Sequence, residues 1–297
     1  MKTILITGGS GFLGSKIAAD FQRQGWQVIL ALRKGYLPER LSKLDKDKVK
    51  TVEVIDGRIN GLSDMHVDVA VHAATCYGRN GESWSQIAEA NIILPLDILM
   101  QAEKIKLGMF INFDTFFNDQ IIFEGNEAIY VKTKKIFSEI LFNASNSLAV
   151  KCVNLRLEQV YGPEDNEKKF IPQIIKSLIS GVEVIKLTGG EQKRDWIYAD
   201  DVVGAVAAIV GRYDNLSRYA EFGIGTGRSI SIKEVAGYLK EITNSKAVLG
   251  FGELPYRQGE IFDSKANISG VNRLGWQSTT DWRDGLKKTV LYYQEKK

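Results

Sequence analysis

Cysteine and histidine are scarce in this chain of 297 residues. The two cysteines are Cys76 and Cys152, and the two histidines are His66 and His72. None of them stands at the spacings that form a zinc site. Two isolated cysteines also fit a reducing compartment better than a disulfide scaffold. We therefore expect neither a metal centre nor a fold held together by disulfides.

Long apolar runs and a strong net charge are absent as well. No apolar segment approaches the roughly 20 residues that a membrane-spanning helix needs. The N-terminus begins directly with a predicted strand, which argues against a signal peptide. The formal net charge of +3 is spread along the chain and forms no basic stripe for nucleic acid. These features predict a cytoplasmic protein that binds neither membranes nor nucleic acid.

What is present is the composition of a globular α/β protein, with 44% hydrophobic and 25% charged residues. Short apolar runs alternate with segments of helical periodicity up to about residue 160. Such alternation implies a parallel sheet covered by helices on both faces. The predicted strands span residues 4–7, 28–32, 52–55, 67–71, 109–113 and 148–155, and the later helices lie near 84–105 and 127–145.

The rhythm changes after residue 160, without a low-complexity linker. The predicted segments there are helices over 170–178, 199–209, 231–243 and 280–294 and strands over 182–187 and 219–224. We therefore predict an α/β protein with a Rossmann-type doubly wound parallel sheet. Residues 1–160 would form the cofactor-binding domain, with 197–212 returning to it. Residues 161–297 would mainly form a smaller C-terminal α/β substrate-binding domain.

A glycine-rich turn joins the first predicted strand to the first helix. Gly8, Gly11 and Gly14 allow the chain to turn tightly, approach a pyrophosphate and pack the helix onto the strand. The backbone N–H groups at the helix start, including those of Phe12 and Leu13, would then face the anion. The position of the turn inside a βαβ unit is the context in which this pattern indicates dinucleotide binding.

The end of the second predicted strand indicates which dinucleotide binds. An acidic residue at this place would bind the ribose 2′-hydroxyl of NAD, but no acid occurs between residues 26 and 38. Arg33 and Lys34 stand there instead and suit the 2′-phosphate of NADP. Asp56 follows the third strand and either contacts the adenine ring or is simply solvated. We predict NADP(H) as the cofactor.

Three residues form a candidate catalytic set. Tyr130 and Lys134 are four apart in a helical stretch, so their side chains lie on one face, one turn apart. A nearby ammonium stabilises phenolate and lowers a tyrosine pKa, which would make Tyr130 an acid or base near neutral pH. Thr115 ends the fifth predicted strand, at the sheet edge where ligands bind in such folds. The order of the three residues predicts hydride transfer at a carbon that bears oxygen.

These motifs resemble those of the extended short-chain dehydrogenase/reductase family, specifically its nucleotide-sugar epimerases, dehydratases and reductases. The resemblance covers nearly the whole chain. It departs from the family where Gln159 replaces an asparagine, and where Thr115 and Tyr130 are separated by a shorter loop than in the epimerases. The matching segments are 7–14 (TGGSGFLG), 71–74 (VHAA), 156–163 (RLEQVYGP), 194–202 (RDWIYADDV) and 257–260 (RQGE).

The resemblance implies further site residues. It places Ala73 and Ala74 beside the cofactor and gives Asn91, in the next helix, a cofactor-binding role. It also implies that Arg194 and Arg257 bind the diphosphate of a nucleotide sugar, to which each guanidinium can donate forked hydrogen bonds.

Other residues near the expected sugar pocket have two readings. Tyr77 and Gln159 either face the sugar or are hydrogen-bonded wall residues. Glu158, in the same loop as Gln159, either contacts the sugar or is a solvated or paired carboxylate.

A homodimer is also implied, because relatives pair the helices that correspond to 84–105 and 127–145. These helices carry more apolar residues than one sheet face needs, namely Ile87, Ile92, Ile136 and Ile140.

Within the family the chain is most similar to reductases of nucleotide-activated 4-keto-6-deoxy sugars. This similarity implies NADPH-dependent reduction of the C4 keto group of a 4-keto-6-deoxy or 3,6-dideoxy sugar, most simply CDP-linked, for surface polysaccharides such as the O-antigen of lipopolysaccharide. The base (CDP, dTDP or GDP), the sugar (hexose or heptose) and the C4 configuration stay open. Two alternatives also remain, a nucleotide-sugar 4-epimerase and a non-catalytic NADP-sensing protein. The stretches that carry the similarity are 74–78 (ATCYG), 110–117 (FINFDTFF), 154–163 (NLRLEQVYGP), 169–172 (KFIP) and 190–192 (GEQ).

Overall fold

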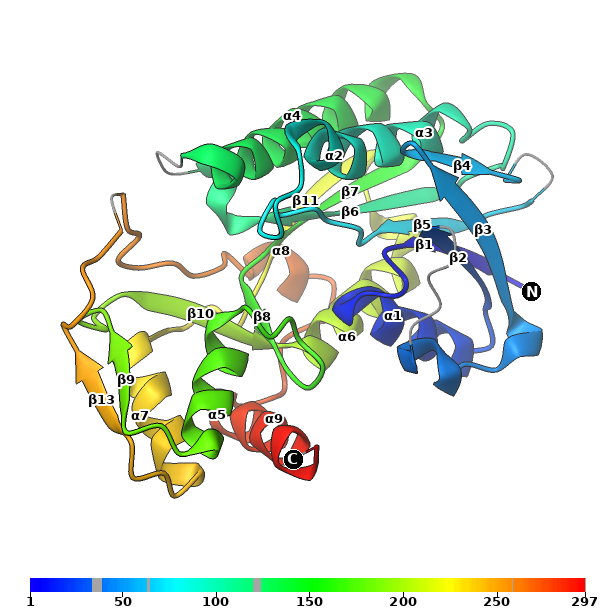
Figure 1. The fold of residues 1–297 in the computed structure, drawn as a ribbon. Helices are drawn as coiled ribbons and strands as arrows, with labels where there is room; N and C mark the ends of the chain where they lie inside the picture. The colour runs from blue at the N-terminus through cyan, green and yellow to red at the C-terminus, as the bar shows by residue number, and fades with distance from the viewer. Residues whose placement is uncertain (34–38, 63–64, 120–123, 258, 297) are drawn as a thin grey trace.

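The computed structural model describes residues 1–33, 39–62, 65–119, 124–257 and 259–296. Its centre is an eight-stranded sheet in the order β11-β7-β6-β5-β1-β2-β3-β4 (Figure 1). All neighbouring strands are parallel except the edge hairpin of β3 and β4. The strands are β1 (Thr3–Thr7), β2 (Gln27–Arg33), β3 (Val49–Ile55), β4 (Arg58–Asn60), β5 (Val69–His72), β6 (Met109–Thr115), β7 (Lys151–Leu157) and β11 (Tyr219–Ile224).

The apolar runs of the sequence form the middle of this sheet. Every residue of β5 and β6 is buried, as expected for parallel strands that are covered on both faces. Because the strands are parallel, their carboxyl ends lie along one edge of the sheet, which is where ligands bind in open α/β sheets. That edge carries Thr7, Arg33, His72, Thr115 and Leu157.

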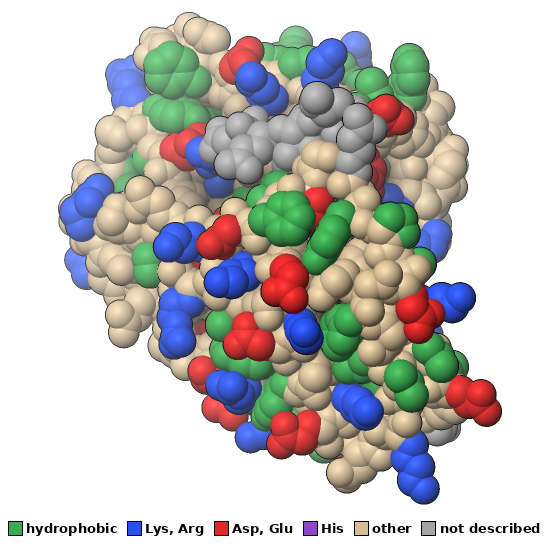
Figure 2. Space-filling view, turned by 90° about the vertical axis from the view of Figure 1, so that its left-hand side faces the viewer, with side chains coloured by type: hydrophobic (Ala, Val, Ile, Leu, Met, Phe, Trp, Pro, Cys, Tyr) green, Lys and Arg blue, Asp and Glu red, His purple; other side chains and the backbone are tan. Residues whose placement is uncertain are grey.

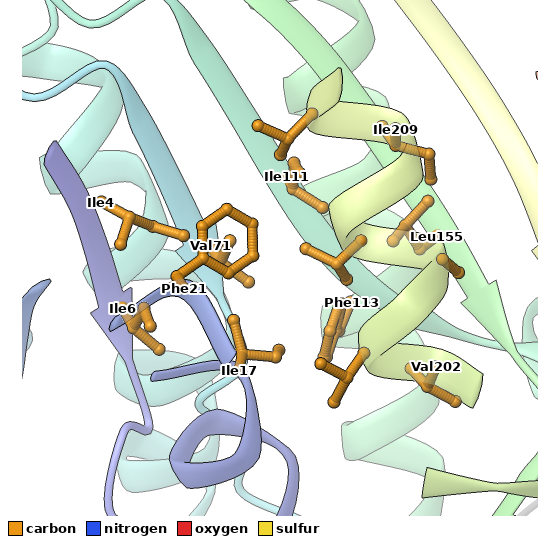
Figure 3. Packing of buried hydrophobic residues seen from close by; sticks show 14 of the residues in the cluster. Ile4, Ile6, Ile17, Phe21, Val71, Ile111, Phe113, Leu155, Val202 and Ile209 are labelled. Carbon is orange, nitrogen blue, oxygen red and sulfur yellow. The ribbon is translucent and has the colours of Figure 1, made fainter. Parts of the chain in front are cut away.

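Helices cover the two faces of the sheet (Figure 1). On one face α1 (Phe12–Arg23) and α6 (Ala199–Gly211) pack over the sheet, and Ile17, Phe21 and Val202 meet strand residues such as Ile4 and Phe113 (Figure 3). The other face is covered by α2 (Trp84–Ala88), the π-helical segment η3 (Glu89–Ile93), α3 (Leu94–Met100) and α4 (Gly125–Ser147). The described short 3-10 helices are η1 (Glu39–Lys43), η2 (Lys46–Lys48), η4 (Phe116–Asp119) and η5 (Tyr213–Asn215).

A smaller α/β region follows the main sheet and has its own core. It contains the three-stranded sheet β12-β10-β8 and the parallel pair β13-β9, packed against three helices. Tyr161 and Trp196 lie in this core, where the Tyr161 hydroxyl donates to the Trp282 carbonyl at 2.9 Å. The elements are β8 (Gln159–Tyr161), α5 (Phe170–Ser180), β9 (Val184–Leu187), β10 (Lys193–Tyr198), β12 (Ser229–Ser231), α7 (Ile232–Ile242), β13 (Val248–Phe251) and α9 (Trp282–Glu295).

Three segments after residue 160 pack with the main sheet, and one of them is α8 (Ser269–Asn272), which packs on β11 and adds Val271 to the core there. Helix α6 lies on the face of this sheet, beside α1. Strand β11 also joins it, pairing in parallel with β7 as the edge strand, which the sequence pattern does not predict. The helix predicted over 84–105 is three pieces, because η3 interrupts it between α2 and α3.

The surface shown in Figure 2 is the left-hand side of Figure 1. Over its described atoms, positive and negative side chains are interspersed. Across the residues that the structure describes, no helix combines the length and the apolar character needed to cross a membrane.

Candidate active site

A cleft of about 2370 Å³ lies at the carboxyl edge of the main sheet and is lined from its other side by the smaller region. Nearly all the predicted site residues line it. They are Gly8, Gly11, Phe12, Leu13, Arg33, Asp56, Ala73, Ala74, Tyr77, Thr115, Tyr130, Lys134, Gln159, Arg194 and Arg257. Two predicted residues are missing from this set, since Lys34 lies outside the described residues and Asn91 does not reach the cleft.

Asn91, for which a cofactor contact was expected, lies behind the cleft wall and hydrogen-bonds to protein groups. Its side-chain oxygen accepts from the Cys76 N–H at 2.9 Å, and its amide donates to the Cys76 carbonyl and to Thr133 Oγ1, both at 3.0 Å. Thr133 in turn donates to the Tyr130 carbonyl at 2.7 Å. The buried amide therefore ties the segment that carries Tyr77 to helix α4, and it supports the site from behind.

The glycine turn has the tight geometry that a pyrophosphate cradle needs. Gly8 has φ +65°, and a Cβ there would lie 2.6 Å from the backbone nitrogen of Ala74. A Cβ on Gly14 would lie 2.2 Å from the Gly8 carbonyl oxygen. The N–H of Gly11 closes the turn on that same oxygen at 2.8 Å, and no side chain caps the start of α1. The chain thus fits a dinucleotide, since the backbone donors at the helix start are not taken by a cap.

Two guanidinium groups, those of Arg33 and Arg40, line the cleft. Arg33 is exposed at the last position of β2, and Asp56 sits in a left-handed turn after β3, with φ 49°. Arg40 comes from η1 and was not predicted as a site residue. It pairs with the Glu164 carboxylate at 3.3 Å and donates to the Glu164 carbonyl at 2.6 Å. Its position depends on that contact across 124 residues, which no local sequence pattern reports.

The three residues of the catalytic set come together on the cleft floor. Tyr130 and Lys134 lie one turn apart on α4, and Thr115 ends β6; all three are buried. The hydroxyls of Thr115 and Tyr130 form a hydrogen bond. The Lys134 ammonium donates to the Phe113 carbonyl at 2.8 Å. The ring of Tyr77 lies 4.8 Å from the ring of Tyr130 and covers it.

The two ionisable groups on α4 are shifted in opposite directions. Burial raises the pKa of Tyr130 well above its usual value, and nearby Tyr77 adds to this, while the hydrogen bond with Thr115 opposes it. Burial lowers the pKa of Lys134 to about 8, against the attraction of Asp114. The prediction that Lys134 depresses the tyrosine pKa is therefore not what the structure shows, because burial dominates there. Tyr130 stays protonated through neutral pH, as a proton donor must.

The two predicted diphosphate arginines are engaged by protein groups. Arg194 is buried in the cleft wall, where it forms an ion pair with Glu260 and donates to the Ile261 carbonyl at 2.5 Å. Arg257 is exposed at the mouth of the cleft and approaches Glu127 of α4 at 3.6 Å. The segment that carries Arg257 rises beside the start of α4 (Figure 1). Both guanidiniums line the cleft, and a substrate diphosphate would have to compete with carboxylates for them.

Two further charged residues that line the cleft are Lys169, which was not predicted as a site residue, and Glu158, for which the sequence left a sugar contact and a paired carboxylate open. Lys169 is largely buried and pairs with Asp165 at 2.9 Å, with its ammonium 5.6 Å from the ring of Phe12. Its place in the stretch Lys-Phe-Ile-Pro was the available signal. Glu158 is buried and accepts from Ser264 at 2.8 and 3.1 Å. Burial raises the pKa of Glu158 to about 7, against that hydrogen bond.

Comparison with known proteins places this site in a family. Residues 4–225 match the NAD dependent epimerase/dehydratase family, and the chain belongs to it. It is thus an enzyme of the extended short-chain dehydrogenase/reductase type, in which a nicotinamide dinucleotide is the cofactor.

Among curated proteins, the chain is 33% identical to a CDP-abequose synthase of Salmonella typhimurium over 97% of both chains. It is 34% identical, again over 97% of both, to a CDP-abequose synthase of Salmonella muenchen. The same fold occurs in the UDP-glucuronic acid 4-epimerase of Bacillus cereus, solved with UDP-glucuronic acid and NAD. That structure is 22% identical and superposes with a TM-score of 0.84 over 99% of this chain and all of the other.

Proposed function

We propose that this protein is an NADPH-dependent reductase of the C4 keto group of a nucleotide-activated 4-keto-6-deoxy or 3,6-dideoxy sugar, most simply a CDP-linked one. The observation that carries the reaction type is the hydrogen-bonded pair of Thr115 and Tyr130, buried on the cleft floor beside the glycine cradle. The similarity to CDP-abequose synthases over nearly the whole chain supports the substrate class. Its product would serve surface polysaccharides such as the O-antigen.

Each residue of the set has one task in this reaction. NADPH, when bound, supplies the hydride that reduces C4. Tyr130 gives its proton to the developing C4 alkoxide, and Thr115 donates a hydrogen bond to the same oxygen. Lys134 holds the nicotinamide ribose, which its buried position beside Tyr130 allows. Arg194 and Arg257 bind the diphosphate and orient the sugar, and orientation can lower a barrier by several kcal/mol.

The preference for NADPH over NADH rests on Arg33. An exposed guanidinium at the last residue of β2 suits a 2′-phosphate, and Arg40 adds a second cation in the same cleft. Replacing Arg33 with Ala is expected to weaken NADPH binding roughly tenfold or more while NADH binding changes little, since a charged hydrogen bond is worth about 1.5–3 kcal/mol. Fluorescence titration with both cofactors measures this. An equal effect on both would contradict the assignment of Arg33 to the 2′-phosphate.

We further propose that the protein works as a homodimer in the cytoplasm. Its cysteines are both free thiols, as in a reducing compartment. Of the four apolar residues that suggested a dimer, one is exposed, and the other exposed apolar side chains of these helices are at different positions. Ile87, Ile92 and Ile140 pack into the core, and only Ile136 is exposed. The exposed apolar side chains of these helices are Trp84, Ile93, Met100, Ile136 and Phe142.

The experiment that tests the activity follows NADPH absorbance as the purified protein meets CDP-, dTDP- and GDP-linked 4-keto-6-deoxy sugars, with NMR of each product. Oxidation with one of them supports the reductase and names the base. A changed sugar without net oxidation would instead indicate the 4-epimerase. Tight NADPH binding with no change in any sugar would favour the sensing protein.

A further inference from the structure

A buried carboxylate without an assigned role stands next to the catalytic set. Asp114 directly precedes Thr115 on β6 and lines the cleft, with 5% of its surface exposed. One of its oxygens accepts from the backbone N–H of Thr115 at 2.8 Å. The other accepts from the side-chain amide of Asn154 on β7 at 2.9 Å. A carboxylate buried at such a place needs compensating charges and hydrogen bonds.

The charge of Lys134 needs a compensating partner as well. Its side chain is 1% exposed, and the hydrogen bond that it donates to the Phe113 carbonyl is to a neutral group. Ionisable neighbours of Lys134 in the described part of the chain stand on α4, β5 and β6. On its own helix stands Tyr130, which burial keeps neutral. From β5 comes His72, whose pKa is well below its usual value because of burial and of Lys134 itself, so it is uncharged too.

The third group is Asp114 on β6, which directly follows Phe113, the residue whose carbonyl accepts from the Lys134 ammonium at 2.8 Å. At that place the attraction of its carboxylate favours the charged form of Lys134. We propose that Asp114 is a positioning residue for the reductase site: its carboxylate is the counter-ion that keeps the Lys134 ammonium charged in the closed site, and its hydrogen bond to the Thr115 N–H fixes the catalytic threonine. This inference rests on the proposed function, since it assigns Lys134 and Thr115 their tasks in that reaction.

A polar network across three adjacent strands favours the ionised form of Asp114. The amide of Asn154 bridges Asp114 on β6 and Glu221 on β11, at 2.9 and 3.0 Å. Arg156 of β7 pairs with Glu221 at 3.2 Å. Burial raises the pKa of Asp114, while the hydrogen bonds from Asn154 and Thr115 and the attraction of Lys134 and Arg156 lower it. The network thus opposes the neutralisation that burial alone would favour.

The physical consequence concerns the pH at which Lys134 loses its proton. A lysine deep in a protein tends to become neutral, and a nearby opposite charge opposes this. Neutral Lys134 would donate a weaker hydrogen bond to the nicotinamide ribose than the ammonium does. Removing the charge of Asp114 should therefore move the loss of Lys134 function to lower pH.

The test compares Asp114→Asn with the unaltered protein and with Glu221→Gln. Both changes replace a carboxylate of one network by an amide, but only Asp114 acts on Lys134. The first readout is the titration of Lys134, followed by NMR of 13C-labelled lysine side chains and assigned with Lys134→Arg. In Asp114→Asn the midpoint should fall by about one pH unit or more. In Glu221→Gln it should stay in place.

The second readout is the pH profile of kcat/KM for NADPH oxidation, whose basic limb should shift with the NMR midpoint. An unchanged or raised Lys134 midpoint in a folded Asp114→Asn protein would overturn the proposal. Because the NMR titration needs no sugar substrate, it tests Asp114 even if the reductase activity is wrong. If the Asp114→Asn protein does not fold, Asp114→Ser provides the same comparison. The serine hydroxyl also lacks the charge but can still accept from the Thr115 N–H.

Discussion

At the scale of single residues, the site holds two ionisable groups whose environments give them separate roles. Burial keeps the phenol of Tyr130 protonated, whereas it brings the ammonium of Lys134 close to losing its proton. In the proposed reaction, Tyr130 is therefore suited to act as the acid, and Lys134 limits the pH range in which the site is complete. The same α4 backbone presents both, so their separation is set by one helical turn.

Replacing Tyr130 with Phe removes the proton donor and keeps the ring that packs on Tyr77. Turnover should fall by roughly 10²-fold or more, because general acid catalysis contributes about that much. The affinity for NADPH should stay within a few-fold, which a fluorescence titration checks. Near-normal turnover would remove Tyr130 from the mechanism.

The pH dependence follows from Lys134. Its pKa lies at about 8 in the folded protein against an ordinary 10.5, so kcat/KM should fall as the pH rises through about 8. Stability should change in the opposite sense, since the unfolded chain binds more protons at Lys134 between these values. Its contribution to the free energy of unfolding therefore rises over that window. Measurements of kcat/KM between pH 6 and 10 check the predicted fall above about pH 8. A profile that stays flat over this range would contradict the prediction.

At the scale of elements, local signals in the sequence predict much of the structure. The glycine turn, the buried strands β5 and β6 and the one-turn spacing on α4 depend on neighbours in the chain, and they lie where they were predicted. The return of β11 to the main sheet, the η3 interruption and the role of Asn91 depend on partners far along the chain. No periodicity of 2 or 3.6 residues encodes such contacts. The hydrogen-bond network around Asp114 likewise depends on residues of other strands that are distant in the sequence.

Two helical glycines provide a matched test of the turn. An Ala at Gly14 would place its Cβ 2.2 Å from the Gly8 carbonyl oxygen, so Gly14→Ala should open the turn and lower both NADPH affinity and thermal stability. Gly237 in α7 has no such neighbour within 4 Å. Gly237→Ala should leave binding unchanged and stabilise the protein by up to about 1 kcal/mol. Urea unfolding measures the stability of each variant, and cofactor titration measures its NADPH affinity. If the two variants behaved alike, the role assigned to the glycine turn in cofactor binding would be wrong.

At the scale of the whole molecule, the cleft lies between two regions with separate cores. The main sheet supplies the cradle and the catalytic set, and the smaller region supplies Arg194 and Arg257. The helices α3 and α4 lie on the same face of the sheet (Figure 1), and their exposed apolar side chains are the surface that we assign to the dimer.

Substitutions that introduce charge into the exposed apolar surface test whether it forms the dimer interface. Met100 and Ile136 are 75% and 44% exposed, and Leu291 on α9 is 56% exposed. The double change Met100→Glu and Ile136→Glu should convert a dimer into monomers, because burying two unpaired carboxylates at an interface is strongly unfavourable. Leu291→Glu, on α9 of the smaller region, should not. Light scattering after gel filtration gives the mass of each protein. If the unaltered protein were a monomer, the assignment of this surface to a dimer interface would be wrong.

The central claim is that this protein transfers a hydride from NADPH to C4 of a nucleotide-linked keto sugar. The most direct measurement supplies NADPH deuterated at nicotinamide C4, on each face in separate samples, and locates the label in the sugar product by NMR. The account predicts deuterium at sugar C4, one per molecule, from one of the two faces. A changed sugar without deuterium at C4, or deuterium at another carbon, would contradict it.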